Sequence, residues 1–213
     1  MDQERFVTIE EMEAATASLL ENGKKVGADS WQQRVKNQTP HCGFGEKGTC
    51  CRICSMGPCR ITPKAPRGIC GCDVHGIVGR NFLRFTAGGS ATHSDHGREI
   101  MHTLNQAKEG GNYQVKDPEK LIRIAKEWGV ETEGKDIYDL AHEMAEIGLM
   151  EYGKPFGVQR YLKRAPEHTQ ELWHKAGIEP RAIDREVSQS MHMTHMGCSS
   201  LPEALIKQSL RAG

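Results

Sequence analysis

Apolar residues recur along most of the chain at intervals of three and four positions, which is the period of an amphipathic α-helix. Asp136 is followed by apolar residues at 137, 140, 141, 144 and 147, and this stripe predicts a helix that begins after the aspartate. Similar stripes, bounded by capping residues or proline at the start and mostly by glycine at the end, predict further helices over 8–22, 73–87, 90–107, 118–128, 166–176, 180–193 and 202–213. Convincing alternation of polar and apolar residues is absent, so we predict a mainly α fold.

The helical pattern is interrupted in two regions. The pair Gly88-Gly89 stands inside a periodic stretch and predicts either a break between two helices or a close approach by another backbone. Residues 24–41 look irregular, and residues 42–72, rich in Gly, Pro and Cys, are expected to form a loop around a bound group. The predicted organisation is an N-terminal helix and connection over 1–41, a cysteine-rich binding segment over 42–72 and a helical domain over 73–213.

The first of these helices begins at a sequence signal of its own. Thr8 and Glu11 form a capping box, in which each side chain can satisfy a backbone amide at the start of a helix. Gly23 is expected to end this helix.

The composition excludes several classes of function. The chain carries 28 basic and 28 acidic residues, and its net charge of zero predicts no electrostatic attraction to nucleic acid or anionic lipid. It has no apolar run of about 18 residues that would span a membrane, and its first residues lack the apolar stretch of a signal peptide. We therefore expect a cytoplasmic protein, in which structural disulfides are disfavoured. Seven of the eight cysteines fall between Cys42 and Cys72, which indicates metal binding.

One set of four cysteines has the spacing expected for an iron–sulfur cluster. Cys51, Cys54 and Cys59 follow the pattern Cys-x2-Cys-x4-Cys, and Cys70 comes after a loop punctuated by proline. Four thiolates can hold a [4Fe–4S] cluster, and nearby arginines would offset its negative charge. Tetrahedral zinc is the alternative, but zinc sites usually come as two short Cys-x2-Cys pairs. The spacing therefore favours an iron–sulfur cluster.

Cys42 and Cys50 remain outside this set. Cys50 directly precedes Cys51, so its side chain is expected to point away from the first site. Two thiolates make half of a four-cysteine site, which a symmetric homodimer would complete by bringing two such pairs together on its axis. Spacing alone supports this interpretation and the alternative, two unligated thiols near the surface, equally. Cys72 and Cys198 have no partners in these patterns, and each is expected to be a buried or spare thiol.

Residues 93–102 contain a run of titratable side chains. His93, His96, Glu99 and His102 are spaced three apart, and on a helix such neighbours lie within about 5–6 Å of one another. A row of this kind could relay protons, because histidine gains and loses a proton near neutral pH. The alternative is a solvated polar face that happens to contain histidines, and the residues alone favour that alternative.

Four long motifs carry a resemblance to a known family. They read HCGFGEKGTCCRICSMGPCRITPKAPRGICG from His41, IVGRNFLR from Ile77, AGGSATHSDHGREI from Ala87 and MHMTHMG from Met191. Together they resemble the catalytic subunit of anaerobic nickel–iron carbon monoxide dehydrogenases. The resemblance covers most of the chain and is strongest over 41–102, and it identifies the chain as an N-terminal portion of that subunit.

The resemblance implies a fold, a reaction and two clusters. The family is a homodimer with a helical N-terminal region, and it catalyses CO + H2O ⇌ CO2 + two protons + two electrons. Its first cluster lies on the dimer axis and is held by a cysteine pair from each subunit, which Cys42 and Cys50 match. Its second [4Fe–4S] cluster is held by a four-cysteine set, which Cys51, Cys54, Cys59 and Cys70 match. Electrons would pass through both clusters to a ferredoxin-like acceptor.

The resemblance also gives the histidine run a role. His93, His96 and His102 match a histidine ladder implicated in proton movement, with His93 as the candidate base nearest the substrate. Glu99 stands where the family usually has histidine; a carboxylate can still pass protons, but the tuning of the relay would differ. Cys72 stands where the family usually has a small residue that is not a ligand.

The nickel–iron–sulfur cluster of the family takes its ligands from later domains. Here only Cys198 follows Cys72, and it does not match those ligands, so the chain alone is expected not to oxidise CO. The resemblance makes an acetyl-CoA synthase a candidate partner. Two alternatives from other classes are a stand-alone iron–sulfur protein for electron transfer or assembly, and a zinc-stabilised interaction domain.

Overall fold

The structure is a computed structural model of the 213-residue chain, and it describes residues 13–108, 110 and 112–213. By their internal contacts these residues form two compact units that meet between Thr49 and Cys50. No helix of the described residues is long and apolar enough to cross a membrane.

The N-terminal unit consists of short helices joined by turns. They are α1 (Ala14–Lys25), α2 (Trp31–Asn37) and α3 (Gly43–Glu46). None of the helical residues of this unit is fully buried. The described part of α1 confirms the predicted helix, although the helix continues past Gly23, and the capping box of Thr8 and Glu11 lies outside the described residues.

The expectation of irregular structure over 24–41 was wrong. The helix α2 lies in this stretch, and the Ser30 hydroxyl caps it by accepting a hydrogen bond from the Gln33 amide at 3.2 Å. At seven residues the helix is too short for an apolar period to show in the sequence.

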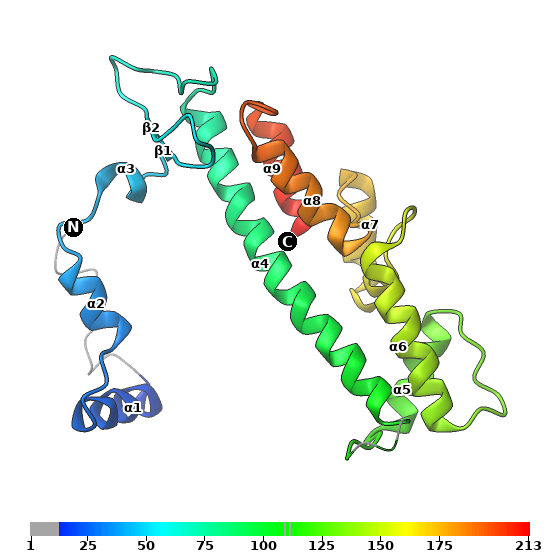
Figure 1. Cartoon of the computed structure of the whole chain (residues 1–213). Helices are drawn as coiled ribbons and strands as arrows, with labels where there is room; N and C mark the ends of the chain where they lie inside the picture. The colour runs from blue at the N-terminus through cyan, green and yellow to red at the C-terminus, as the bar shows by residue number, and fades with distance from the viewer. Residues whose placement is uncertain (1–12, 109, 111) are drawn as a thin grey trace. The chain divides into compact units, whose positions relative to one another are not determined.

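One long helix organises the second unit. The helix α4 runs without interruption from Val74 to Gln106 (Figure 1), and the Asp73 carboxylate caps it by accepting a hydrogen bond from the Gly76 amide at 2.9 Å. The predicted interruption at Gly88-Gly89 was wrong in both of its forms. A Cβ on either glycine would meet nothing within 4 Å, and the helix passes straight through both positions. Packing of other helices along α4 outweighs the low helix propensity of two glycines.

The remaining elements confirm a mainly α fold. In chain order they are β1 (Cys50–Cys51), β2 (Cys59–Arg60), α5 (Pro118–Glu127), α6 (Ile137–Gly153), the 3-10 helix η3 (Arg160–Arg164), α7 (Glu167–Ala176), α8 (Ile183–Thr194) and α9 (Pro202–Ala212). Helices α6, α8 and α9 lie along α4 (Figure 1). The starts of α5, α6, α7 and α9 match the sequence signals, whereas α8 begins later than Pro180 indicated.

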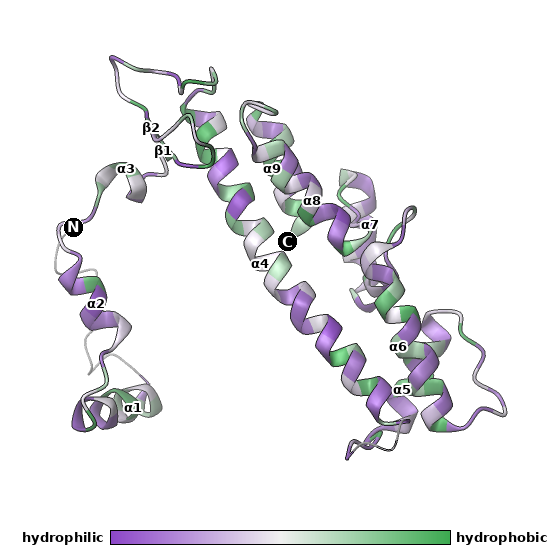
Figure 2. Ribbon diagram, in the orientation of Figure 1, coloured by the Kyte–Doolittle hydropathy of each residue, from purple (hydrophilic) through white to green (hydrophobic). Residues whose placement is uncertain are grey.

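Two hydrophobic clusters lie in the second unit. One joins α5 to α6 through Ala125, Trp128, Leu140 and Met144. The other lies at the cysteine-rich end and contains Cys51, Cys72 and Ile77. Polar and apolar residues alternate around the helices of this unit (Figure 2), as expected for helices that each bury one face.

The apolar residues of α4 face in two directions. Ile77, Leu83 and Ala87 are buried against the neighbouring helices. In contrast, Val78, Phe82 and Phe85 stay exposed and follow one another at helical spacing, so they form an apolar stripe on the free side of α4. We call these three residues the apolar stripe.

Candidate metal centre

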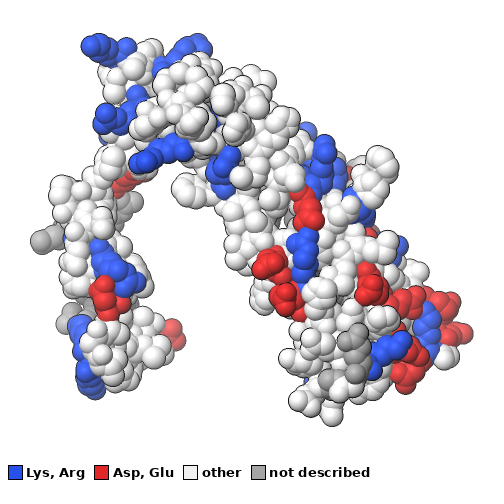
Figure 3. Space-filling model, in the orientation of Figure 1, with Lys and Arg blue, Asp and Glu red and all other residues white. Residues whose placement is uncertain are grey.

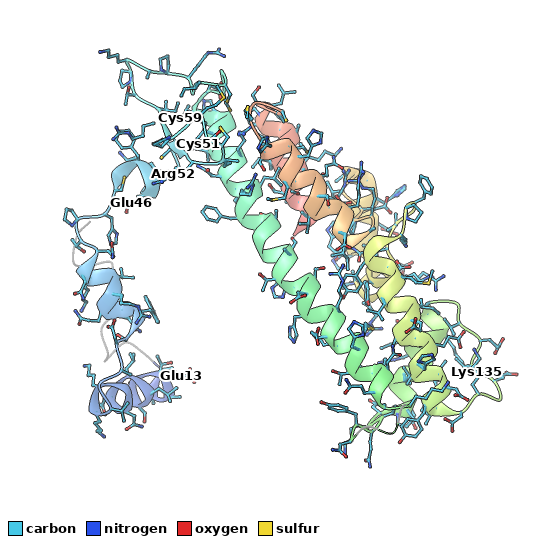
Figure 4. The ribbon with its side chains drawn as sticks, viewed as in Figure 1. Glu13, Glu46, Cys51, Arg52, Cys59 and Lys135 are labelled. Carbon is cyan, nitrogen blue, oxygen red and sulfur yellow. The ribbon has the colours of Figure 1, made fainter. Side chains whose placement is uncertain are left out.

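The cysteine-rich segment contains a small hairpin whose two strands are two residues long each. Strands β1 and β2 pair antiparallel, with Cys51 opposite Cys59 and Cys50 opposite Arg60. Figure 4 labels Cys51 and Cys59, which lie near the start of α4. The hairpin thus brings together two thiols that are eight positions apart in the sequence.

The four cysteines of the predicted set line one hollow. Its walls include Cys51, Cys54, Cys59 and Cys70, and it is partly open to solvent. No group of three or more His, Cys, Asp or Glu residues converges as ligands of a single ion in the part of the chain that the structure describes. Instead the thiols surround a space, and such an arrangement suits a group with several metal atoms. Their role as ligands stays a prediction.

The surroundings of the hollow suit a negatively charged sulfur cluster. The Ile69 amide donates a hydrogen bond to the Cys59 sulfur at 3.4 Å, the kind of contact that stabilises a thiolate. The first turns of α4 form another wall, with Ile77 and Arg80 among the lining residues. The N-terminal end of a helix carries partial positive charge, so this wall favours a bound anion.

Cys72 also lines the hollow, which spacing did not indicate. Its side chain is buried between Cys51 and Ile77 in the local apolar cluster. Burial raises the pKa of the Cys72 thiol, and the positive charge of Arg80 opposes that shift. A Cβ on Gly76 would lie 2.5 Å from the Cys72 sulfur, so the first turn of α4 presses closely on this thiol. The environment favours a neutral thiol at this position.

Arg80 is the second lining residue that sequence reasoning missed. Its side chain is only 1% exposed, and its Nη1 donates a hydrogen bond to the Ser199 carbonyl at 2.8 Å. Its Nη2 donates to the Thr194 carbonyl, whereas its Nε is buried without a partner. The available signal was the helical period, because Arg80 falls three residues after Ile77 and three before Leu83 in the buried stripe of α4.

Cys42, Cys50 and Cys198 lie outside the hollow. Cys42 is exposed and precedes α3 in the N-terminal unit, while Cys50 is half-buried in β1 of the second unit. The Cys50 carbonyl accepts a hydrogen bond from the Asn81 side chain at 2.9 Å, which ties β1 to α4. The shared dimer-axis site stays a prediction. Cys198 is exposed in the loop between α8 and α9.

The predicted histidine relay lies on the middle of α4. His93, His96, Glu99 and His102 are all exposed in this chain. His93 also lines a second cavity of about 580 Å³, together with Ser94 and the aromatic residue Tyr152. The other three residues do not line this cavity, so of the predicted relay His93 alone contributes to it. Proton transfer along the run stays a prediction.

A cysteine-lined hollow at the start of one long helix defines a mainly α protein with a candidate metal–sulfur centre. A family model described as the Prismane/CO dehydrogenase family matches residues 49–213, and the chain belongs to this family. The predicted family resemblance is thereby confirmed.

Relatives and solved structures agree with the family assignment. The chain is 42% identical over 205 residues to carbon monoxide dehydrogenase 1 of Methanosarcina mazei, covering 94% of this chain and 33% of that protein. It is 34% identical to the carbon monoxide dehydrogenase/acetyl-CoA synthase subunit beta of Moorella thermoacetica, covering 84% of this chain and 28% of that protein.

The fold is also similar to that of a solved enzyme. The as-isolated, nickel-free carbon monoxide dehydrogenase of Thermococcus sp. AM4 matches with a TM-score of 0.85 and 40% identity, over 98% of this chain and 34% of that one. The chain therefore spans about a third of the length of the proteins that it matches.

Proposed function

We propose that this chain is the electron- and proton-exit portion of an anaerobic carbon monoxide dehydrogenase. The observation that carries the proposal is the hollow lined by Cys51, Cys54, Cys59 and Cys70 at the start of α4. Membership of a carbon monoxide dehydrogenase family supports CO oxidation as the reaction that this portion serves.

The four thiolates would hold a [4Fe–4S] cluster, which supplies one-electron transfer when bound. The protein's own part is to fix the thiolates and to donate hydrogen bonds such as that from the Ile69 amide. These contacts set the charge and polarity around the sulfur atoms, and both influence the reduction potential. A second cluster, shared across a dimer axis by Cys42 and Cys50 of two copies, would pass the electrons onward.

The charge of the cysteine-rich end supports a ferredoxin-like acceptor. The segment 50–72 contains Arg52, Arg60, Lys64 and Arg67 and no acidic residue. Figure 3 shows Lys and Arg over this end of the unit, whereas Asp and Glu gather on the end formed by α5 and α6. A basic surface next to the electron donor would attract an acidic acceptor and orient it.

The apolar stripe supports a homodimer. Val78, Phe82 and Phe85 are exposed on α4, and Asn81 of the same helix holds the Cys50 carbonyl. A second copy that covered this stripe would also approach Cys50, which needs a partner pair to complete a four-cysteine site. Burial of two phenylalanines and a valine would contribute several kcal/mol per chain, at about 1.5–3 kcal/mol for each side chain.

The histidine run supports a proton exit. His93 opens onto the second cavity, and His96, Glu99 and His102 lead from it along α4 on the exposed surface. Exposed imidazole and carboxylate groups can exchange protons with water, so the run would deliver to solvent the protons that CO oxidation releases.

The remaining parts of the proposal come from the relatives. Nickel would be bound outside the residues of this chain, which then would not oxidise CO alone. An acetyl-CoA synthase is a candidate partner, because one relative is named as a subunit of a joint enzyme. We also propose a cytoplasmic location.

Replacement of one thiol tests the central proposal. Cys54→Ala removes a ligand from the hollow, so the anaerobically purified protein should lose the iron and the visible absorption of the second cluster. Cys198→Ala is the matched control, because Cys198 is an exposed thiol that does not line the hollow, and it should keep both. An unaltered spectrum in Cys54→Ala, or a colourless zinc protein from the wild type, would contradict the proposal.

A further inference from the structure

Arg80 carries a buried positive charge that no acidic residue of the described chain balances. Its side chain is 1% exposed, and none of the ion pairs among the described residues includes it. Two backbone carbonyls accept its Nη hydrogen bonds, and its Nε is buried without a partner. A buried cation satisfied only by dipoles is costly, because it has lost water and gained no counter-charge.

A negative charge that balances Arg80 could lie in the hollow. Arg80 lines it together with the predicted ligands Cys51, Cys54, Cys59 and Cys70. A [4Fe–4S] cluster with four thiolate ligands is an anion, and it becomes more negative when it is reduced. The unbalanced charge and the proposed anionic group therefore meet at one wall of the same space.

The other cations of this end are placed differently. Arg52, Arg60 and Arg67 are exposed, so water and salt screen their charges. Arg67 donates a hydrogen bond to the Gly71 carbonyl at 3.1 Å and does not line the hollow. The nearest acidic side chain in the sequence, Asp73, is engaged as the cap of α4 through the Gly76 amide. Arg80 is thus the buried cation of the hollow, and the partly buried Asp73 carboxylate is the acidic group that also acts on Cys72 there.

We propose that Arg80 is the counter-charge of the four-cysteine cluster and holds its reduction potential up. The inference rests on the proposed function, because it requires a cluster in the hollow. A positive charge stabilises the reduced form of the cluster more than the oxidised form, since the reduced form carries one more negative charge. Arg80 is a positioning residue in this scheme, and it has no ligand role.

Redox titration of two Arg80 variants tests this role. Arg80→Gln removes the charge and Arg80→Lys keeps it, and both variants lose the forked hydrogen bonds to the Ser199 and Thr194 carbonyls. Iron content and the electron paramagnetic resonance signal of the reduced cluster are followed against potential in the anaerobically purified, iron-loaded protein. The relevant signal is the one that Cys54→Ala loses.

The reduction potentials of the two variants should differ. For Arg80→Gln we expect the equilibrium constant for reduction to fall by about tenfold or more, which is a shift of about 59 mV per tenfold for a one-electron couple. For Arg80→Lys we expect a potential near that of the wild type. Arg84→Gln is the matched control one turn further along α4, since Arg84 contacts the Thr194 hydroxyl and does not line the hollow, and it should leave the potential unchanged.

Each failure has a distinct meaning. Equal potentials in Arg80→Gln and the wild type, or equal shifts in the Gln and Lys variants, overturn the counter-charge. If Arg80→Gln binds no iron, the test depends on Arg80→Lys. A cluster in Arg80→Lys with the wild-type potential supports the proposal. A shifted potential, or no cluster, in Arg80→Lys shows that packing is what matters and overturns the proposal. Absence of any cluster in the wild type would instead refute the proposed function.

Discussion

Two glycines of α4 should respond in opposite ways to the same substitution. Gly76 and Gly88 both lie in this helix, but their surroundings differ. A Cβ at Gly76 would stand 2.5 Å from the Cys72 sulfur and 2.7 Å from the Ser200 carbonyl oxygen, which is closer than real Cβ atoms come to other atoms. A Cβ at Gly88 would meet nothing within 4 Å. Gly76→Ala and Gly88→Ala therefore form a matched pair.

The expected magnitudes follow from these contacts. Alanine is favoured over glycine inside a helix by up to about 1 kcal/mol, and Gly88→Ala should gain most of that. Gly76→Ala has the same intrinsic advantage, but it forces a thiol and a backbone carbonyl to move, and such overpacking costs about 1–3 kcal/mol. The net loss should be about 1–2 kcal/mol, which lowers the Tm of a chain of this size by about 2–8 °C. Gly88→Ala should raise the Tm by about 2–4 °C.

Thermal and urea unfolding followed by circular dichroism at the helical band measure both variants against the wild type. Iron loading adds a functional readout, because the Cys72 side chain that Gly76→Ala displaces lines the hollow. We expect reduced iron content in Gly76→Ala and full content in Gly88→Ala. A Gly76→Ala protein as stable as Gly88→Ala would refute the close packing of the first turn of α4 on Cys72 and Ser200.

Two further predictions concern the dimer and the acid stability of the helical unit. Cys42→Ala should remove one cluster per dimer, seen as half a cluster per chain in iron analysis; loss of a whole cluster per chain would contradict a shared site. Burial raises the pKa of Glu186, but hydrogen bonds from Arg181 and Gln208 more than offset this and leave the pKa lowered. A lowered folded-state pKa gives stability that is present above the ordinary glutamate pKa and lost as the pH falls through the folded value. Glu186→Gln should therefore flatten the fall of the urea midpoint on acidification, and an unchanged pH profile would contradict this.

The sequence predicted most helices because their ends carry local signals. Asp117 and Asp136 accept hydrogen bonds from the first amides of α5 and α6, as aspartate caps should. Gly177 ends α7 in the left-handed conformation that glycine favours. These signals depend on a few neighbouring residues, so they can be recognised without the fold.

The error at Gly88-Gly89 arose where distant contacts decide the structure. The continuity of α4 through Gly88-Gly89 depends on the helices packed along it, and a local pattern does not contain those contacts. The same holds for the candidate site. Spacing grouped the four cysteines, but it did not indicate that Cys72 and Arg80 also line the hollow, and the Ser199 carbonyl that accepts a hydrogen bond from Arg80 is 119 residues away in the sequence.

The unbroken course of α4 also fixes the length of this part of the chain. Insertion of one residue would turn every later side chain by about 100° and advance it by about 1.5 Å. Ser94 would then leave its buried position, and Met101 would lose its place against Gly148 of α6, where there is no room for a Cβ. No loop within these 33 residues can absorb the change. Insertions and deletions that keep the fold must therefore fall outside α4, and the packing along this helix fixes the number of residues between Arg80 and the histidines.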